Sequence, residues 1–371
     1  MTAGGPRPIA FFLPTVRGGG AQRVIVNLVQ GITERGIQVD LVLAAATGVF
    51  LDQLPAAVRL VDLRSNRLHR SLVPLTGYLR RERPRALVSS MSHANLIALW
   101  AARLARRGTP VVVTVHNTMS QSQSTGTGGR FSGALESRLL RAFYPWAARV
   151  VAVSRGAADD LARTSGLPRE RVRVVYNPVI TPAVMAVARQ RADHPWLAAG
   201  QPPVVLGVGR LTAQKDFPTL IRAFAAVRKQ EPARLIILGE GEDRSRLEAL
   251  ADELGVRPDV DLPGFRDDAM AFMAHSSLFV LSSAWEGLPT VLIEALAAGT
   301  RVVSTDCPSG PREILQDGRL GTLVRVGDHV TLAEAMLDAL RRPAEPIPAE
   351  TLAPFTRDVA VDNYLRLIES A

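Results

Sequence analysis

Short apolar runs rich in valine, isoleucine and leucine alternate with longer amphipathic segments along the whole of this 371-residue chain. Strands that are apolar throughout, with helices between them, are typical of parallel sheets that helices cover on both faces. The pattern therefore predicts an α/β protein with doubly wound parallel sheets. The expected strands are IAFFLP, VDLVLA, ALVSS, PVVVTV and RVVAVS in the first half, and PPVVLGVG, ARLIILG, DVDLPG, LFVLSS, TRVVST and GTLVRV in the second.

The length of the chain predicts two domains. One hydrophobic core rarely serves more than about 250 to 300 residues, and hydrophobic residues make up 47% of this sequence, enough to fill two cores. Two prolines interrupt the alternation in YNPVITPAVM, which marks the boundary. We expect an N-terminal domain over 1–178, a C-terminal domain over 179–354, and a final helix over 355–371, where apolar residues recur at helical spacing.

Composition also indicates where the protein resides. Cys307 is the single cysteine, so no internal disulfide can form and a cysteine-based metal site is disfavoured. No stretch approaches the roughly 20 apolar residues needed to span a bilayer. The run IAFFLP near the N-terminus is too short for the apolar region of a secretory signal. We therefore expect a soluble, cytoplasmic protein.

Positive charge is concentrated in the first half. Residues 1–178 contain 24 arginines and 9 acidic residues, a net of +15, whereas the remainder has a net of −6. A basic half indicates an anionic partner, which is a membrane surface, a phosphorylated substrate or a nucleic acid. Aromatic residues make up only 5% of the chain and do not interleave with the arginines. Stacking platforms for nucleic acid are thus disfavoured, and we expect no nucleic-acid partner.

Residues that directly follow the strands are the candidates for ligand binding, because open parallel sheets bind ligands beyond the carboxyl ends of their strands. In GVGRLTAQKD, Gly209 allows a ligand to approach the backbone, and Arg210 and Lys215 lie five positions apart. We interpret the two cations as ligands of a diphosphate. The sequence GEGED, after the next strand, lacks the third glycine of a dinucleotide-binding fingerprint.

A second candidate segment is EGLPTVLIEA. We expect Pro289 in the first turn of a helix, where its missing N–H is tolerated. The amides near Thr290 and Val291 would then form an anion site at the helix start. Glu286 precedes that turn, and Glu294 lies among aliphatic residues within the helix. A carboxylate there needs a polar partner, and we expect both glutamates to accept hydrogen bonds from sugar or ribose hydroxyls.

These motifs, together with RGGGAQR near the N-terminus, resemble glycosyltransferase family 4 along nearly the whole chain. The resemblance implies retaining enzymes of GT-B fold, with two Rossmann-like domains facing a cleft, that use nucleotide sugars. It implies that Glu286 holds hydroxyls of the donor sugar, that Glu294 holds the ribose, and that Arg210 and Lys215 hold the diphosphate. It also implies that the last helix returns to the N-terminal domain. Gln22 stands where the family often has a glutamate.

Further candidate contacts lie at the ends of other strands, and for His116 the family resemblance supports the role. His116, at the end of PVVVTV, is expected to bind a donor hydroxyl or to steer the acceptor, although a structural histidine is the alternative. Ser154 is expected to cap a helix, with acceptor contact as the lesser role. Gly264 and Phe265 either wall the base or form a turn. The predicted catalytic residues are His116, Arg210, Lys215 and Glu286. The predicted donor-binding residues are Gly19, Gly20, Gly209, Arg210, Lys215, Gly264, Phe265, Glu286, Gly287, Leu288, Thr290, Val291 and Glu294.

The sequence therefore predicts transfer of a hexose or N-acetylhexosamine from a UDP- or GDP-sugar to a lipid-linked or polysaccharide acceptor in cell-surface glycan biosynthesis. Fixed cations and amides would stabilise the departing diphosphate, so we expect neither a metal nor another cofactor. A nucleotide-sugar epimerase or a phosphorylase of the same fold is the alternative. A basic nucleic-acid-binding protein is less favoured.

Two basic segments bear on the acceptor. Residues 67–85 and 130–149 mix arginines with leucines and aromatic residues. Such mixtures suit the interface of an anionic membrane, but they also suit helices whose apolar faces belong to the core. On the first interpretation, the enzyme would be peripheral to the inner face of the cytoplasmic membrane.

Overall fold

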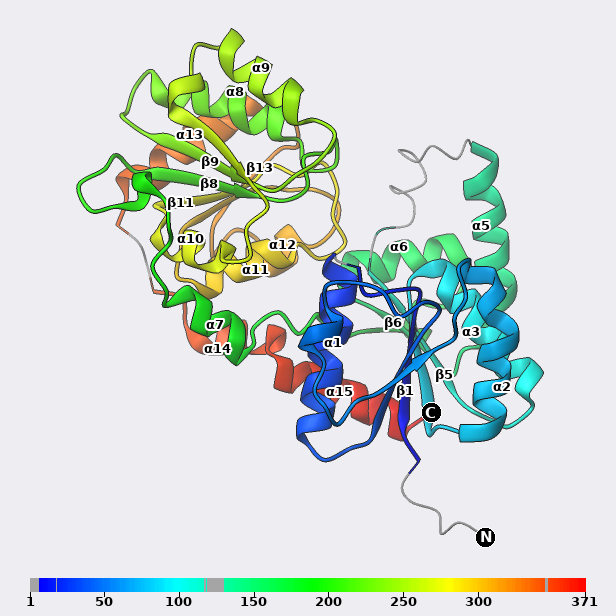
Figure 1. Ribbon diagram of the computed structural model, residues 1–371. Helices are drawn as coiled ribbons and strands as arrows, with labels where there is room; N and C mark the ends of the chain where they lie inside the picture. The colour runs from blue at the N-terminus through cyan, green and yellow to red at the C-terminus, as the bar shows by residue number, and fades with distance from the viewer. Residues whose placement is uncertain (1–6, 18, 117, 119–129, 344–345) are drawn as a thin grey trace. The chain divides into compact units, whose positions relative to one another are not determined.

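The computed structural model describes residues 7–17, 19–116, 118, 130–343 and 346–371, and it divides into two compact α/β units (Figure 1). The first unit comprises Met1–Pro178 with Pro354–Ala371, and the second comprises Val179–Ala353. Each unit contains one parallel sheet, so the predicted fold class is confirmed. The predicted loop at 120–129 lies outside the described residues.

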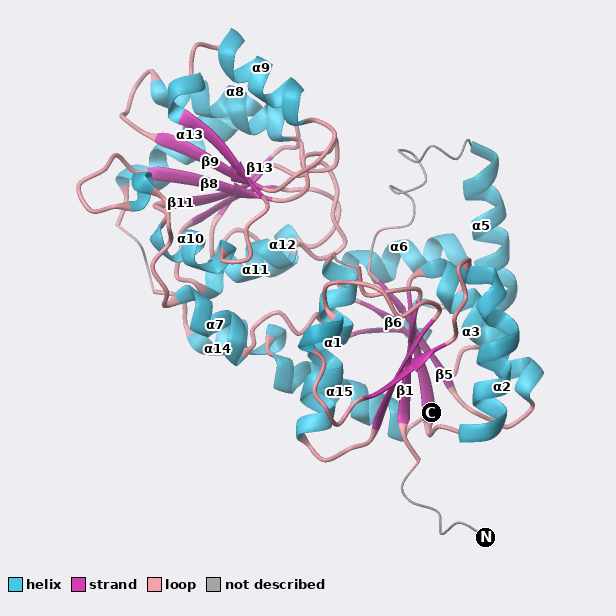
Figure 2. Cartoon of the chain, in the orientation of Figure 1, coloured by secondary structure: helices cyan, strands magenta, loops and turns pink. Residues whose placement is uncertain are grey.

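The first unit is built on a seven-stranded sheet with the order β3-β2-β1-β4-β5-β6-β7, in which every neighbouring pair is parallel. Helices cover both of its faces (Figure 2). Its strands are β1 (Ile9–Leu13), β2 (Val39–Leu43), β3 (Arg59–Asp62), β4 (Ala86–Ser90), β5 (Val111–Val115), β6 (Arg149–Ala152) and β7 (Val172–Val174). Its helices are α1 (Gly20–Glu34), α2 (Leu72–Glu82), α3 (Ser92–Ala105), α5 (Arg130–Phe143), α6 (Arg155–Ser165) and α15 (Arg357–Glu369).

Five strands of the first unit coincide with the predicted runs, and the two at the edges of the sheet were missed. In β3, three of the four residues are exposed, and charged residues stand at both ends of the strand. In β7, only three residues pair, and the middle one is exposed. Edge strands need apolar residues on fewer sides than central strands do, so their sequences lack a continuous apolar run.

The second unit has a six-stranded parallel sheet with the order β10-β9-β8-β11-β12-β13, and all six strands match the predicted runs. They are β8 (Val204–Val208), β9 (Arg234–Leu238), β10 (Val260–Gly264), β11 (Leu278–Leu281), β12 (Val302–Thr305) and β13 (Thr322–Val324). The helices are α7 (Pro182–Ala188), α8 (Phe217–Arg228), α9 (Arg244–Glu253), α10 (Ala269–His275), α11 (Thr290–Ala297), α12 (Pro311–Ile314), α13 (His329–Arg341) and α14 (Ala349–Leu352).

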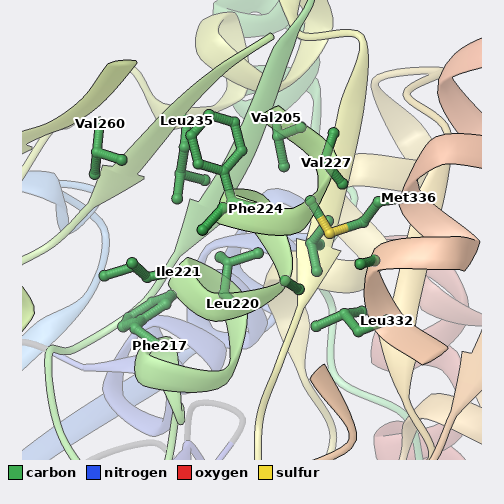
Figure 3. Packing of buried hydrophobic residues seen from close by; sticks show 14 of the residues in the cluster. Val205, Phe217, Leu220, Ile221, Phe224, Val227, Leu235, Val260, Leu332 and Met336 are labelled. Atoms are coloured by element: carbon green, nitrogen blue, oxygen red, sulfur yellow. The ribbon is translucent and has the colours of Figure 1, made fainter. Parts of the chain in front are cut away.

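The core of the second unit explains why its strands could be predicted from their apolar sequences. Phe224 and Leu220 of α8 pack with Leu235 of β9 and with Leu332 and Met336 of α13 (Figure 3). All five side chains are fully buried. Full burial of one such side chain stabilises the fold by roughly 1.5 to 3 kcal/mol. Apolar residues are therefore required on this face of the sheet as well as on the helices that cover it.

The strand orders place one topological switch point in each sheet. The direction of winding reverses between β1 and β4 in the first unit and between β8 and β11 in the second. Ligands of open α/β sheets bind beyond the carboxyl ends of the strands at such points. In the second unit, the loops in question are those that follow β8 and β11.

The C-terminal helix α15 packs against α1 within the first unit. Val361 and Tyr364 are buried, and the Tyr364 hydroxyl lies 3.3 Å from the Thr114 hydroxyl. The guanidinium of Arg357 donates a 2.5 Å hydrogen bond to Glu34. Apolar contact and charge pairing thus tie the end of the chain to the N-terminal sheet.

Close contact between α1 and α15 depends on a glycine. A Cβ atom at Gly31 would lie 2.8 Å from Cγ2 of Val361, closer than real contacts allow. We predict that Gly31→Ala lowers the free energy of unfolding by about 1 to 3 kcal/mol, the range for overpacked sites, despite the better helix propensity of alanine. Urea unfolding measures the change.

Gly77 in α2 is the matched control, because it is also inside a helix. A Cβ there would meet only the far end of the flexible Arg81 side chain, at 3.3 Å. Gly77→Ala should leave stability unchanged or raise it by up to about 1 kcal/mol. Equal stabilisation by both substitutions would contradict the packing of α15 on α1.

Candidate active site

Arg210 and Lys215 lie in the loop between β8 and α8, at the switch point of the second sheet. Arg210 is exposed and forms no ion pair with a described residue. Lys215 is largely buried, and its side chain is 16% exposed. The loop thus presents one free guanidinium to solvent and one enclosed ammonium.

The loop after β9 fixes the shape of the Arg210 loop. A Cβ at Gly239 would lie 1.9 Å from the Gly209 oxygen, and one at Gly241 would lie 2.3 Å from the Leu211 oxygen. The Leu211 amide donates to Glu240 O at 2.9 Å. The glycines of GEGED are therefore needed for two backbones to pack directly, a role that the sequence pattern did not reveal.

Lys215 and Glu286 form a close ion pair. Lys215 Nζ lies 2.6 Å from Glu286 Oε1, which also accepts a 2.7 Å hydrogen bond from Ser283 Oγ. Glu286 is buried, and Gln214 Nε2 lies 3.4 Å from its second carboxylate oxygen. The buried carboxylate thus has a cation and two polar partners, which offset its loss of hydration.

The sequence predicted separate ligands for these two residues, a diphosphate for Lys215 and sugar hydroxyls for Glu286. The structure adds that the two side chains are in direct contact with each other. An anion placed beside Lys215 would compete with the carboxylate for the ammonium. A hydroxyl placed beside Glu286 would instead add a donor that the carboxylate can still accept.

Helix α11 begins at Thr290, one residue later than predicted. Pro289 occupies the N-cap position with φ −70° and ψ 99°, so it precedes the first helical turn instead of opening it. The amides of Thr290 and Val291 lie in that turn, where helical N–H groups lack partners within the helix. Glu294 lies half-buried one turn further along α11.

The loops that follow β12 and β10 lie at the same carboxyl edge of the second sheet. Ser309 Oγ, in the loop after β12, donates a 2.7 Å hydrogen bond to the Gly287 oxygen and so braces the turn that contains Leu288. Gly264 ends β10, and its carbonyl accepts from the Gly239 amide at 2.8 Å. Phe265, which follows, is 73% exposed, so an aromatic face is available beside these loops.

In the first unit, the predicted residues also lie directly after strands or at the N-terminal ends of helices. Gly19, with φ 114°, is the N-cap of α1, and Gly20 is the first residue of that helix. Ser154 accepts a 3.0 Å hydrogen bond from the Ala157 amide, so it caps α6. Its hydroxyl is buried, and the capping role predicted for it is therefore present.

His116 directly follows β5. Both ring nitrogens are buried, and neither has a hydrogen-bond partner among the described residues. Burial lowers the pKa of His116 from its usual 6.5 to about 4. The ring is therefore neutral near pH 7, with one N–H donor and one acceptor that no described protein group uses.

Family models match both halves of the chain. A model described as "Glycosyltransferase Family 4" matches residues 18–181, and one described as "Glycosyl transferases group 1" matches residues 189–352. The lipopolysaccharide core biosynthesis glycosyltransferase LpsE of Rhizobium meliloti is 32% identical over 361 residues, which covers 95% of this chain and 96% of the relative. The chain belongs to glycosyltransferase family 4.

Solved structures show the same fold. A complex of Anabaena HepE with UDP and glucose has a TM-score of 0.80 at 20% identity and covers 98% of this chain and 100% of its own. The apo form of the lipopolysaccharide outer core galactosyltransferase WaaB has a TM-score of 0.73 at 20% identity and covers 98% and 99%. The fold of this glycosyltransferase is GT-B, as predicted.

The glycosyltransferase contains one Asp-x-Asp sequence, Asp259 to Asp261, although we expected none from the sequence, and that expectation was wrong. Each carboxylate is hydrogen-bonded to a side chain, one to an arginine guanidinium and the other to a histidine imidazole. Arg228 Nε lies 2.7 Å from Asp259, and His194 Nε2 lies 2.9 Å from Asp261. Within the described residues, no group of three or more histidine, cysteine or acidic side chains is arranged to hold a metal ion.

The low pKa of His116 predicts how the stability of the glycosyltransferase depends on pH. Below pH 6.5, the unfolded chain takes up a proton at this residue, whereas the native state does not until about pH 4. As the pH is lowered from 6.5 to 4, the free energy of unfolding should therefore decrease, by about 1 kcal/mol per pH unit from His116 alone.

Chemical unfolding of the wild type and of His116→Gln between pH 7 and pH 4 tests this. The variant lacks the titrating ring, so its free energy of unfolding should decline less steeply. The other histidines and the carboxylates contribute equally to both proteins. Identical slopes would show that His116 is not held neutral by burial.

Proposed function

We propose that the protein is a retaining glycosyltransferase that transfers a hexose or N-acetylhexosamine from a nucleotide diphosphate sugar. The observation that carries this proposal is the grouping of Arg210, the Lys215–Glu286 pair and the start of α11 at the switch point of the second sheet. An exposed guanidinium and helix-start amides suit a diphosphate. An adjacent carboxylate suits the hydroxyls of a sugar.

On this proposal, each part of the donor meets a different group. Arg210, Lys215 and the amides of Thr290 and Val291 hold the diphosphate, and Glu286 accepts from sugar hydroxyls. Glu294 accepts from the ribose. Phe265, exposed beside the loops after β9 and β10, offers a face to the base. Gly209, Gly264, Gly287 and Leu288 contribute backbone that the donor can approach.

Catalysis on this proposal is electrostatic. Negative charge develops on the diphosphate as the bond to the sugar breaks, and preorganised cations and amides stabilise it at that position. His116, neutral near pH 7, donates or accepts one hydrogen bond at a donor or acceptor hydroxyl.

We predict that Arg210→Ala lowers kcat by a factor of about 10² to 10³, the usual effect of losing one contact that stabilises the transition state. Affinity for inorganic pyrophosphate in calorimetry should fall as well. Glu294→Ala is the matched comparison. It should weaken binding of the nucleoside diphosphate and leave pyrophosphate binding unchanged, because its proposed partner is the ribose. Loss of pyrophosphate binding in both variants would contradict the separate roles.

We also propose that transfer needs no metal ion, since Arg210 and Lys215 supply positive charge where a metal would otherwise act. Turnover of the nucleotide sugar should persist in excess EDTA, measured as release of the nucleoside diphosphate. Abolition by EDTA with recovery on addition of Mg²⁺ or Mn²⁺ would refute this.

For the acceptor, we propose a lipid-linked or polysaccharide glycan in cell-surface biosynthesis. The names of two relatives support it. LpsE acts in lipopolysaccharide core biosynthesis, and a Campylobacter jejuni relative, 30% identical over 66% of this chain, is an N-acetylgalactosaminyltransferase acting on a diphospho-undecaprenol substrate. The diphosphate in the second of these names would suit the basic first half.

We further propose that the first unit binds an anionic membrane surface. Part of each basic segment belongs to the core, as one alternative predicted, because Tyr78 and Leu140 are buried. Among the described side chains of these segments, Val73 and Leu135 are 78% and 57% exposed. No helix in the described part of the chain is long and apolar enough to cross a bilayer.

The first unit also has a partly exposed aromatic cluster. The rings of Trp100, Phe143 and Trp146 meet edge to face with centroids 4.9 to 5.1 Å apart. Both tryptophans are more than one-third exposed, and the Arg103 guanidinium lies 5.0 Å from the Trp146 ring centroid. Exposed tryptophan beside arginine suits the boundary between lipid headgroups and acyl chains.

Co-sedimentation with vesicles tests the membrane proposal. Binding should require anionic lipid and weaken with salt, and Trp146→Ala should reduce it several-fold. Phe265→Ala removes another exposed aromatic ring, from the second unit, and should leave vesicle binding unchanged. Equal binding to zwitterionic vesicles, or equal loss in both variants, would contradict the proposed surface.

A further inference from the structure

The first unit contains a cavity of about 300 Å³ at the amino edge of its sheet, the edge opposite to the predicted site residues. The segments before β1, β4 and β5, which are neighbours in the sheet, line it together with the last turn of α15. A cavity of this size is at the lower end of the range for small-molecule sites. Its charged lining residues are Arg7, Arg83, Arg85, Arg107 and Glu369.

The four arginines of this cavity have no carboxylate partner. None of them forms an ion pair within 4 Å with a described acidic residue, and this holds for Glu369, the acidic residue that lines the same cavity. Elsewhere in the same unit arginines do find acids, as Arg59 does with Asp40 at 2.5 Å. Four like charges around one cavity repel each other, and an anion between them would relieve that repulsion.

Two arginines beside the cavity occupy a backbone conformation that favours glycine. Arg83 ends α2 with φ 47°, and Arg106, next to Arg107, ends α3 with φ 54°. Glycine adopts this left-handed conformation without steric penalty and is the usual residue there. Gly166 does so at the end of α6. Two helix ends beside the cavity therefore have a cation where glycine would fit with less strain.

The donors around the cavity suit phosphate. Arginine binds phosphate oxygens through two parallel N–H groups. The amides of Gly108 and Thr109, which also line the cavity, donate to no acceptor among the described residues. Charged forks and neutral amides together match the several oxygens of a phosphate or diphosphate group.

We propose that this cavity is a second anion site, which binds a phosphate-bearing ligand and is separate from the transferase site. The strands between the two edges of the sheet have five residues. At roughly 3.3 Å per residue, the edges are about 15 Å apart. The inference rests on the first unit alone and does not depend on the donor assignment in the second.

Calorimetric titration with inorganic pyrophosphate tests the proposal. The double variant Arg7→Gln/Arg107→Gln should bind pyrophosphate at this site at least tenfold more weakly than the wild type. Arg171→Gln/Arg173→Gln makes the same charge change on exposed arginines outside the cavity and outside the two basic segments, and it should bind as the wild type does. In Arg210→Ala, which removes the proposed diphosphate contact in the second unit, one pyrophosphate site should remain.

The proposal is overturned if pyrophosphate does not bind, if both double variants lose affinity equally, or if only Arg210→Ala loses it. Failure of the donor assignment would instead leave pyrophosphate binding unchanged in Arg210→Ala. Vesicles of phosphatidic acid then distinguish the source of the phosphate. Weaker vesicle binding by Arg7→Gln/Arg107→Gln, together with its loss of pyrophosphate binding, identifies a lipid headgroup. Unchanged vesicle binding identifies a free phosphorylated compound.

Discussion

Parallel pairing of the strands is the constraint on which the rest of this structure depends. All strands of a parallel sheet end at the same edge, so loops distant in sequence meet there. Lys215 and Glu286 are 71 positions apart, yet they form a 2.6 Å ion pair because β8 and β11 are neighbours. The winding of the sheet reverses between these two strands, which opens the edge to a ligand. A buried cation and carboxylate are thereby held where a diphosphate sugar can meet both.

Much of this arrangement could be predicted from the sequence. Central strands are apolar on both faces, so all six strands of the second unit and five of the first stood out. Strand ends then identified Arg210, Lys215 and Glu286 as candidates. The edge strands β3 and β7 escaped because exposure removes the need for apolar residues.

Pairings between side chains could not be predicted in the same way. The contact of Lys215 with Glu286 depends on strand order, which no single motif encodes. The packing of Gly239 against Gly209 depends on the approach of two loops in space. Asp259 and Asp261 have the Asp-x-Asp spacing, but each carboxylate is paired with a side chain from elsewhere in the sequence, Arg228 and His194 respectively.

The central claim is that the C-terminal unit binds the diphosphate of a nucleotide sugar, and thermal-shift measurements with matched ligands test it most directly. Uridine, UDP and UDP-glucose differ by a diphosphate and a sugar, and guanosine, GDP and GDP-mannose form a parallel series. Ligand that binds only the native state raises the Tm in proportion to the logarithm of its concentration. The account predicts a clear rise with the diphosphate and the sugar nucleotide of one series, and little with the nucleoside. Equal shifts with nucleoside and diphosphate, or no shift with any member of either series, would contradict it.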